Sequence, residues 1–308
     1  MRMRSGIVIV LLFGAALISA QSPLPRPVVP GNGITNGASF DTGPIAPGSI
    51  ISIFGSNLGL QMVDGATTPR SFAVTEVPVG TSLGGHSVVF RNPSAAGVIS
   101  QNAGVAAPLF FVTGEANPNQ INAQVPWELA GQQNAEMIIR VNDGAGGMTE
   151  SEPVPVAVSP EGISPAVFTF GAEPRRAIAV NVSQTADVIV GSLAQPAEVV
   201  QGGQPALPGT RLILYANGLG PVQPAAATGD NSLNPPLLRT ATQLPAITVG
   251  GRPAIVEFSG LAPEFVGVYQ VNLLLPEDLP PGNEVPIRME LGGLLSRDDV
   301  TIAVRARP

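Results

Sequence analysis

The sequence contains no cysteine and no lysine, and His86 is its only histidine. Without cysteine there is no disulfide, thiol nucleophile or thiolate metal site, and without lysine there is no Schiff base or P-loop lysine. A single histidine also excludes a cluster of imidazole metal ligands. We therefore expect no cofactor, no metal site and, from these classes of chemistry, no catalytic residue.

Charged residues are also few, at 12% of the chain against 44% hydrophobic residues, whereas glycine and proline are abundant, at 36 and 32 residues. That glycine and proline content stays below the roughly 25–30% that is typical of disordered chains, so the chain is expected to fold. No stretch of about 10–12 residues combines a helical period with capping residues. These features predict a loop-rich, all-β protein.

The first residues have the order of a secretory signal peptide. Arg2 and Arg4 precede an uncharged apolar run, Gly6–Ile18, which is followed by small residues up to Ala20. The run is shorter than the about 20 residues that a membrane-spanning helix needs, although an uncleaved anchor is the alternative. We expect residues 1–20 to be removed after Ala20, so that the mature protein is secreted or held at the cell surface.

The charge balance bears on the possible partners. The full chain has a net charge of −7, and cleavage of the signal peptide would remove arginines but no acid. The arginines are scattered, and only Arg175 and Arg176 are adjacent, which we interpret as a solvated turn. Because nucleic-acid binding needs clustered basic residues, we expect no nucleic-acid partner. No later apolar run approaches 18 residues, so we also expect no membrane span in the mature chain.

Two segments of the chain resemble each other at a constant offset. They are Ala46–Gly59 (APGSIISIFGSNLG) and Leu207–Gly220 (LPGTRLILYANGLG). Further downstream, Gln120–Pro126 (QINAQVP) is similar to Gln270–Pro276 (QVNLLLP), and the order of the segments is the same. Self-similarity of this kind is the mark of an internal repeat, so we predict a tandem duplication.

The periodicity within each half is that of β-strands. Ile121, Ala123 and Val125 alternate with polar residues, and valines alternate in the same way over 154–158 and over 300–304. Successive side chains of a strand point to opposite faces, so this pattern indicates strands with one buried face. Asp-Gly at 143–144 favours a hairpin turn, and residues 129–136 are expected to form a helical turn or a loop.

Many short strands per half point to two tandem immunoglobulin-like antiparallel β-sandwiches. We place the first sandwich at residues 34–160 and the second at 161–308, with the boundary near Ser159–Gly162, where proline and glycine interrupt the strand pattern. Residues 21–33, with their many prolines, are expected to be an extended leader that needs no packed structure.

Several longer motifs resemble a known family. The segments that carry the resemblance are Asn36–Phe40, Ala46–Gly59, Gln120–Leu129, Tyr215–Val222 and Gly260–Asn272. With them, the chain is similar to the uncharacterised Solibacter-type C-terminal domain of secreted acidobacterial proteins, and its PGSxxxIxGxNLG pattern resembles the immunoglobulin-like IPT/TIG fold. This resemblance implies secretion and a β-sandwich, and it implies no catalytic residue.

One motif has the form of a hydrolase nucleophile. Gly80–Gly84 matches G-x-S-x-G with Ser82 at its centre, and His86 follows two residues later. A nucleophile elbow requires a strand before the serine, a helix after it and a distant histidine. The residues after Gly84 have a strand pattern instead, so we interpret this motif as a turn that enters a strand, and His86 as a structural imidazole.

Other chemically suggestive residues have similar structural explanations. Gly218–Gly220 lacks the third glycine and the helix of a dinucleotide site, so we interpret it as a turn. The adjacent Asp298 and Asp299 should point to opposite faces of a strand, and therefore should not act together. The acids of the first half are expected to be a solvated rim, with a Ca²⁺ site as the alternative. They are Asp143, Glu150 and Glu152.

Two aromatic residues are the candidates for binding a partner. Trp127 is the only tryptophan and follows a predicted strand, where it serves either as a plug over the end of the sandwich or as an exposed anchor. Tyr269 is expected to be exposed. Phe54 and Tyr215, which are aligned by the repeat, are both expected in the core.

These features predict a secreted, non-catalytic structural or interaction module that binds an extracellular protein or polysaccharide through loops at the sandwich ends. The candidate loops are Val222–Leu238 and Glu115–Gln120. One alternative is a carbohydrate-binding module with Trp127 or Tyr269 as the stacking platform. A second alternative is an esterase-like hydrolase that uses Ser82 and His86.

Overall fold

The computed structural model describes residues 24–64, 66–92, 104–142, 147–171, 173–183, 185, 188–233 and 239–306. The predicted signal peptide and the Asp-Gly turn at 143–144 lie outside these residues. No helix in the described ranges has the length and apolar character needed to cross a bilayer. Almost all regular structure in them is β-strand, as expected.

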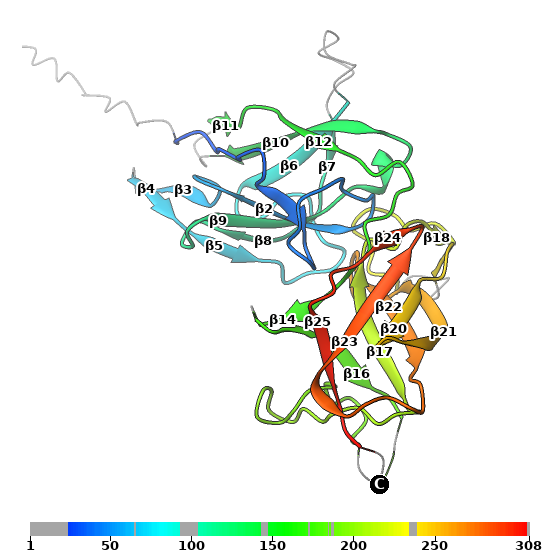
Figure 1. The fold of residues 1–308 in the computed structure, drawn as a ribbon. Helices are drawn as coiled ribbons and strands as arrows, with labels where there is room; N and C mark the ends of the chain where they lie inside the picture. The colour runs from blue at the N-terminus through cyan, green and yellow to red at the C-terminus, as the bar shows by residue number, and fades with distance from the viewer. Residues whose placement is uncertain are drawn as a thin grey trace, which may run out of the picture.

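The first half consists of two antiparallel sheets that face each other (Figure 1). Their buried residues form one core, which runs from Leu24 to Val158. One sheet has the order β1-β2-β9-β8-β5, with the strands β1 Ile34–Asn36, β2 Ile50–Gly55, β9 Asn119–Gln124, β8 Leu109–Thr113 and β5 Ser71–Ala73. The other has the order β11-β10-β6-β7, with β11 Met148–Glu150, β10 Asn134–Asn142, β6 His86–Arg91 and β7 Val105–Ala106, and β12 Val154–Ala157 also pairs with β10. A separate hairpin joins β3 Leu60–Val63 and β4 Ala66–Pro69.

The second half has its own core, which runs from Ile163 to Val304. Its strands follow the path β13-β17-β22-β21-β20-β23-β25-β15-β14. The strand β21 pairs with β20 through its first residues and with β22 through the rest, with a bulge between Val256 and Phe258. It therefore connects the two parts of the path on either side of it. The strands of the path are β13 Ala166–Val167, β17 Arg211–Asn217, β22 Tyr269–Leu274, β21 Arg252–Leu261, β20 Ala246–Val249, β23 Gly282–Leu291, β25 Val300–Val304, β15 Arg175–Ala177 and β14 Thr169–Phe170. Short additional strands are β16 Ala179–Asn181, β18 Val222–Gln223, β19 Thr240–Ala241 and β24 Leu294–Leu295.

The two similar segments form the same turn and the same strand pair. In each half a Pro-Gly turn precedes the strand, and Gly48 and Gly209 have φ angles of 79° and 75°. The hydroxyl two residues after the proline donates back across the turn, from Ser49 Oγ to Ala46 O at 2.6 Å and from Thr210 Oγ1 to Leu207 O at 2.7 Å. A proline followed by a residue with positive φ is the signature of a type II turn, where only glycine is unstrained.

The strand that follows each turn pairs with the predicted counterpart in the same register. In the first half Ile50 faces Gln124, and in the second half Arg211 faces Leu274. These are the positions that the sequence comparison aligns.

Alternation predicts burial correctly for three residues of β9, since Ile121 and Ala123 are fully buried and Asn122 is not, but it is wrong for Gln124, which is buried. It is also wrong for β25, in which all five residues from Val300 to Val304 are buried. The edges of this strand pair with β23 and β15, and the burial of all five residues shows that both of its faces are covered as well.

Four local expectations are corrected by the structure. The described part of the leader is packed: Leu24 is buried in the first core, and Val28 and Ser56 exchange backbone hydrogen bonds of 3.0 Å. The segment 129–136 is a helical turn and loop, as expected, only up to residue 133: it holds the end of the 3-10 helix Trp127–Leu129 and a turn, and residues 134–136 begin β10 instead. Arg175 and Arg176 lie in β15 rather than in a solvated turn.

The fourth correction concerns Phe54 and Tyr215. Both are only half-buried, because they point to the face of their strands opposite to the core residues Ile53 and Leu214. They contact Phe40 and Phe265, with ring centroids 6.2 and 6.0 Å apart.

Candidate functional site

The two halves meet at a junction whose centre is the side chain of Asn217. This amide is fully buried and forms two hydrogen bonds with the Ile50 backbone, as a neighbouring β-strand does. Its Oδ1 accepts from the Ile50 N–H at 2.9 Å, and its Nδ2 donates to the Ile50 carbonyl at 2.8 Å. Nδ2 also donates to Asn36 Oδ1 at 2.9 Å, and Asn36 donates in turn to the Ser164 carbonyl at 2.9 Å. Because every one of these polar atoms has a hydrogen-bond partner, the cost of removing them from water is offset. We call this set of hydrogen bonds among Asn217, Ile50, Asn36 and Ser164 the Asn217 seam; it favours one placement of the two halves.

Trp127 supplies the apolar part of the junction. Its ring lies on Gly48, where an added Cβ would approach Cζ2 to 2.1 Å, and it packs against the core of the second half. Its backbone N–H donates to Thr228 Oγ1 at 2.9 Å, and that hydroxyl donates to Glu128 Oε2 at 2.6 Å. Trp127 is therefore part of the first half in sequence, but its ring contacts residues of both halves.

Gln124 connects the same region to the second half. Its side chain is buried, with Oε1 accepting from the Gly229 N–H at 2.8 Å and Nε2 donating to the Gly48 carbonyl at 3.3 Å. Gly229 also lies close to the first half through its carbonyl, which accepts from the Val79 N–H at 3.2 Å. The loop after β18 is thus held against the first half at several points.

An ionic network crosses the junction on another side. Arg297 donates to Asp41 Oδ1 at 2.7 Å and to Asp299 Oδ1 at 2.8 Å, and Arg175 lies 3.3 Å from Asp299. The hydrogen bond from Arg297 lowers the pKa of the Asp299 carboxyl below its usual value, and the same bond raises the pKa of the Arg297 guanidinium. Both groups therefore stay charged over the whole neutral range.

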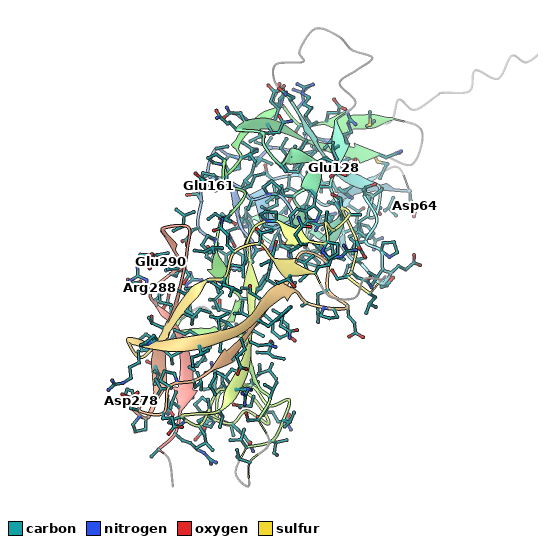
Figure 2. The ribbon with its side chains drawn as sticks, turned by 90° about the vertical axis from the view of Figure 1, so that its right-hand side faces the viewer. Asp64, Glu128, Glu161, Asp278, Arg288 and Glu290 are labelled. Carbon is teal, nitrogen blue, oxygen red and sulfur yellow. The ribbon has the colours of Figure 1, made fainter. Side chains whose placement is uncertain are left out.

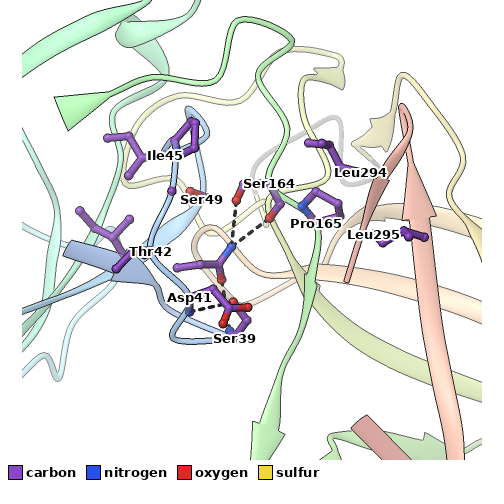
Figure 3. Close-up of a pocket in the computed structure, with 13 residues that line it drawn as sticks. Ser39, Asp41, Thr42, Ile45, Ser49, Ser164, Pro165, Leu294 and Leu295 are labelled. Atoms are coloured by element: carbon purple, nitrogen blue, oxygen red, sulfur yellow. Dashed lines mark hydrogen bonds between the residues drawn. The ribbon is translucent and has the colours of Figure 1, made fainter. Parts of the chain in front are cut away.

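A pocket of about 210 Å³ opens beside Asn36 (Figure 3). It is lined by the loop 39–45 of the first half, by Ser164 and Pro165, and by Leu294 and Leu295 at the tip of the β23–β24 hairpin. Asn36 is already committed to Ser164 and Asn217, Asp41 to Arg297, and Ser49 to the Ala46 carbonyl. The pocket therefore offers few free polar atoms for orienting a small ligand.

The two predicted partner-binding residues have different surroundings from those expected of exposed anchors. Trp127 is half-buried in the junction, and its Nε1 is shielded from solvent. The expectation that Tyr269 is exposed is wrong: its side chain is fully buried in the second core and its hydroxyl donates to the Gly220 carbonyl. Burial raises the pKa of Tyr269 far above its usual value, and this buried ring has no open face for stacking on a sugar.

The hydrolase-like motif forms a tight turn before β6. Ser82 is exposed, whereas His86 is fully buried and its Nδ1 lies 3.0 Å from the Gly84 carbonyl. Among the described residues no hydrogen bond joins Ser82 to His86, and Leu83 and His86 are bridged across the turn. Burial lowers the pKa of the His86 imidazole, while hydrogen bonds to backbone groups oppose that shift. The local geometry is the predicted turn into a strand.

The acidic residues are dispersed or paired with arginine. Glu150 accepts from Arg140 at 2.6 Å, and Glu152 pairs with Arg26; Asp143 lies outside the described residues. No group of three possible metal ligands occurs in the described part of the chain. Figure 2 shows labelled acids spread over both halves: Asp64, Glu128, Glu161, Asp278 and Glu290.

The two candidate loops differ in their roles. The described part of Val222–Leu238 packs on the first half through Thr228 and Gly229, so much of it is internal to the junction. The loop Glu115–Gln120 is shaped by Asn119, whose side chain donates to the carbonyls of Gly114 and Ala116 at 3.1 and 2.7 Å. Sequence reasoning missed Asn36, Gln124 and Asn217. Strand alternation places Gln124 and Asn217 on the exposed face of their strands, so it gave no signal that they are buried.

No protein-family model and no curated protein matches the chain. A solved structure of fibronectin(III)-like modules of Clostridium thermocellum CbhA is similar over 88% of this chain and 94% of that chain, with 12% identity and a TM-score of 0.18. The expected all-β, immunoglobulin-like fold class is confirmed by the sheets themselves.

Proposed function

We propose that the protein is exported and acts outside the cell as a non-catalytic structural or interaction module, made of two tandem immunoglobulin-like domains that arose by duplication. The signal-like residues 1–20 and the resemblance to the Solibacter-type family support export. The equal turn geometry and strand register of the two halves support the duplication.

The observation that carries the proposal is the junction. Its buried amides are all partnered, and a fully hydrogen-bonded polar seam fixes one relative placement of two domains better than apolar contacts do. A scaffold fixed in this way presents its exposed loops at constant spacing, which suits recognition of an extended partner. The exposed Ser82 and the buried His86 do not provide the nucleophile and base of a hydrolase.

Affinity capture from the extracellular fraction of the native host tests the proposal. We expect the protein without residues 1–20 to retain a specific protein or polysaccharide, and we expect replacement of residues 115–118 by a shorter glycine linker to change that retention. A hydrolysis assay with p-nitrophenyl acetate is the companion measurement. Turnover that is abolished by Ser82→Ala would contradict a non-catalytic role.

A further inference from the structure

A second concave surface lies at the junction, away from the pocket around Asn36. It is a groove of about 310 Å³ between the segment that follows β5 and the loop that precedes β22. Val79 and Val266 are buried beneath it, whereas Val77 and Phe265 are 52% and 49% exposed. We call this surface the valine groove and define it by six residues: Val74, Val77, Val79, Phe110, Phe265 and Val266.

The backbone along one wall of the valine groove is free to pair. β5 is the last strand of its sheet, and the ladder to β8 ends where the Val74 N–H donates to the Phe110 carbonyl at 2.9 Å. The next backbone bond is from the Val79 N–H to the Gly229 carbonyl. Between them, Thr75, Glu76 and Val77 are exposed and make no backbone hydrogen bond with another described residue. Unpaired backbone groups beside an edge strand are the usual site at which an extended peptide adds to a sheet.

Two carboxylates line the same groove, Glu76 from the first half and Glu264 from the second. Neither forms a salt bridge with an arginine of the described chain, in contrast to Glu257 or Asp299. Glu264 has a φ angle of 74°, which is uncommon for a residue other than glycine, and its N–H donates to the Asn231 carbonyl at 3.0 Å. The backbone thus holds this carboxylate beside the groove.

We propose that the valine groove binds an extended segment of another protein in which apolar side chains alternate with arginine or lysine. Alternation lets one face of the segment enter the apolar groove while its cationic side chains reach Glu76 and Glu264. A second copy of this chain is a poorer occupant, because the chain is acidic, with a net charge of −7, and would bring like charge to these carboxylates. This inference rests on the proposed interaction function and names its surface and the chemistry of its partner.

Fluorescence anisotropy with two labelled peptides tests the inference on the full mature chain. One peptide has three Val-Arg repeats, and the other has three Val-Glu repeats. The test variant carries Glu76→Gln and Glu264→Gln. The matched control carries Glu173→Gln and Glu198→Gln, which remove the same charge from exposed acids that do not line the groove.

We expect the Val-Arg peptide to bind at least tenfold more tightly than the Val-Glu peptide. The test variant should weaken that binding about five- to tenfold at low salt, and the control should change it less than twofold. Equal affinity for the two peptides, no binding of either, or equal losses in both variants would overturn the inference.

The oligomeric state provides a second measurement. Sedimentation should show a monomer; a wild-type dimer that the Val-Arg peptide dissociates would mean that a second copy of the chain occupies the groove. If affinity capture yields a partner whose retention is the same in the Glu76→Gln, Glu264→Gln variant, the valine groove is the wrong surface while the proposed interaction function stands.

Discussion

His86 has a fully buried imidazole in a chain with no other histidine, so its titration is visible without interference from another side chain of its kind. Desolvation is the largest cause of its lowered pKa, since burial disfavours the charged form. The unfolded chain, with a pKa of about 6.5 for this residue, then binds the proton more readily than the folded protein does. Acid therefore shifts the equilibrium toward unfolding.

We expect the free energy of unfolding to be insensitive to His86 above about pH 7 and to fall as the pH drops below about 6.5, until the folded protein is protonated too. The loss is about 1.4 kcal/mol for each unit by which the folded pKa is lowered. Urea denaturation at pH 7.5 and 5.5 measures it. His86→Gln should remove most of this dependence; an unchanged difference between the two pH values in the variant would assign it to other groups.

Gly48 combines two constraints at one residue, a φ angle of 79° and direct contact with the Trp127 ring. Gly131 is a matched control, because it has a φ angle of 80° and no atom within 4 Å of an added Cβ. We expect Gly131→Ala to cost about 1 kcal/mol through backbone strain alone. Gly48→Ala should cost about 1–3 kcal/mol more, because the indole must move. Thermal denaturation of both variants makes the comparison. Equal losses of stability would show that the Trp127 ring moves aside without cost.

At the scale of elements, the loop after β18 depends on one buried ion pair. Arg239 and Asp230 have side chains only 8% and 12% exposed and are 2.9 Å apart, and Arg239 also donates to the carbonyls of Pro224 and Ala225. These bonds fold the loop so that Thr228 and Gly229 reach the first half. The ion pair therefore acts on the junction without lying in it.

We expect Arg239→Leu to destabilise the protein by about 3–5 kcal/mol, because Asp230 is left buried without its partner. The double variant Arg239→Leu, Asp230→Leu should recover part of that loss, since no uncompensated charge remains. Urea denaturation of the two single variants and the double variant completes the cycle. If the double variant is as unstable as the sum of the single ones, the pair is not coupled.

A strand or turn could be predicted from the sequence where residues close to it in the chain determine its structure. Alternation in β9 and the paired Pro-Gly turns follow from rules that span a few residues. Tyr269 was placed wrongly although it shares a face of β22 with Val271 and Leu273, an alternation that indicates its burial. The strand β25 pairs with β15, and the Leu24 carbonyl accepts from Thr149 Oγ1; both contacts span more than 100 positions of the chain, so no local pattern could reveal them.

At the scale of the whole molecule, the Asn217 seam determines how the halves are placed relative to each other. Asn181 is a matched control, because it is also a buried asparagine of the second half but bonds to Ser192 and Gln204 within that half. Asn217→Ala removes the groups that bind Ile50 and Asn36 while leaving both cores in place.

We expect both Asn217→Ala and Asn181→Ala to lower stability by about 1–3 kcal/mol. Only Asn217→Ala should broaden the distribution of distances between the halves, which small-angle X-ray scattering detects as a larger radius of gyration. An unchanged scattering curve for Asn217→Ala would mean that Trp127 and the ionic network are sufficient to fix the halves.

The spacing of the junction partners along the chain has a kinetic consequence. Asn217 contacts Asn36 across 181 positions and Ile50 across 167, and Gly229 contacts Gln124 across 105. Contacts of such high contact order form late, and a chain made from its N-terminus completes the first sandwich before Asn217 exists. During that interval the indole and the Ile50 N–H would lie uncovered, so this nascent intermediate is the species in which aggregation competes with folding.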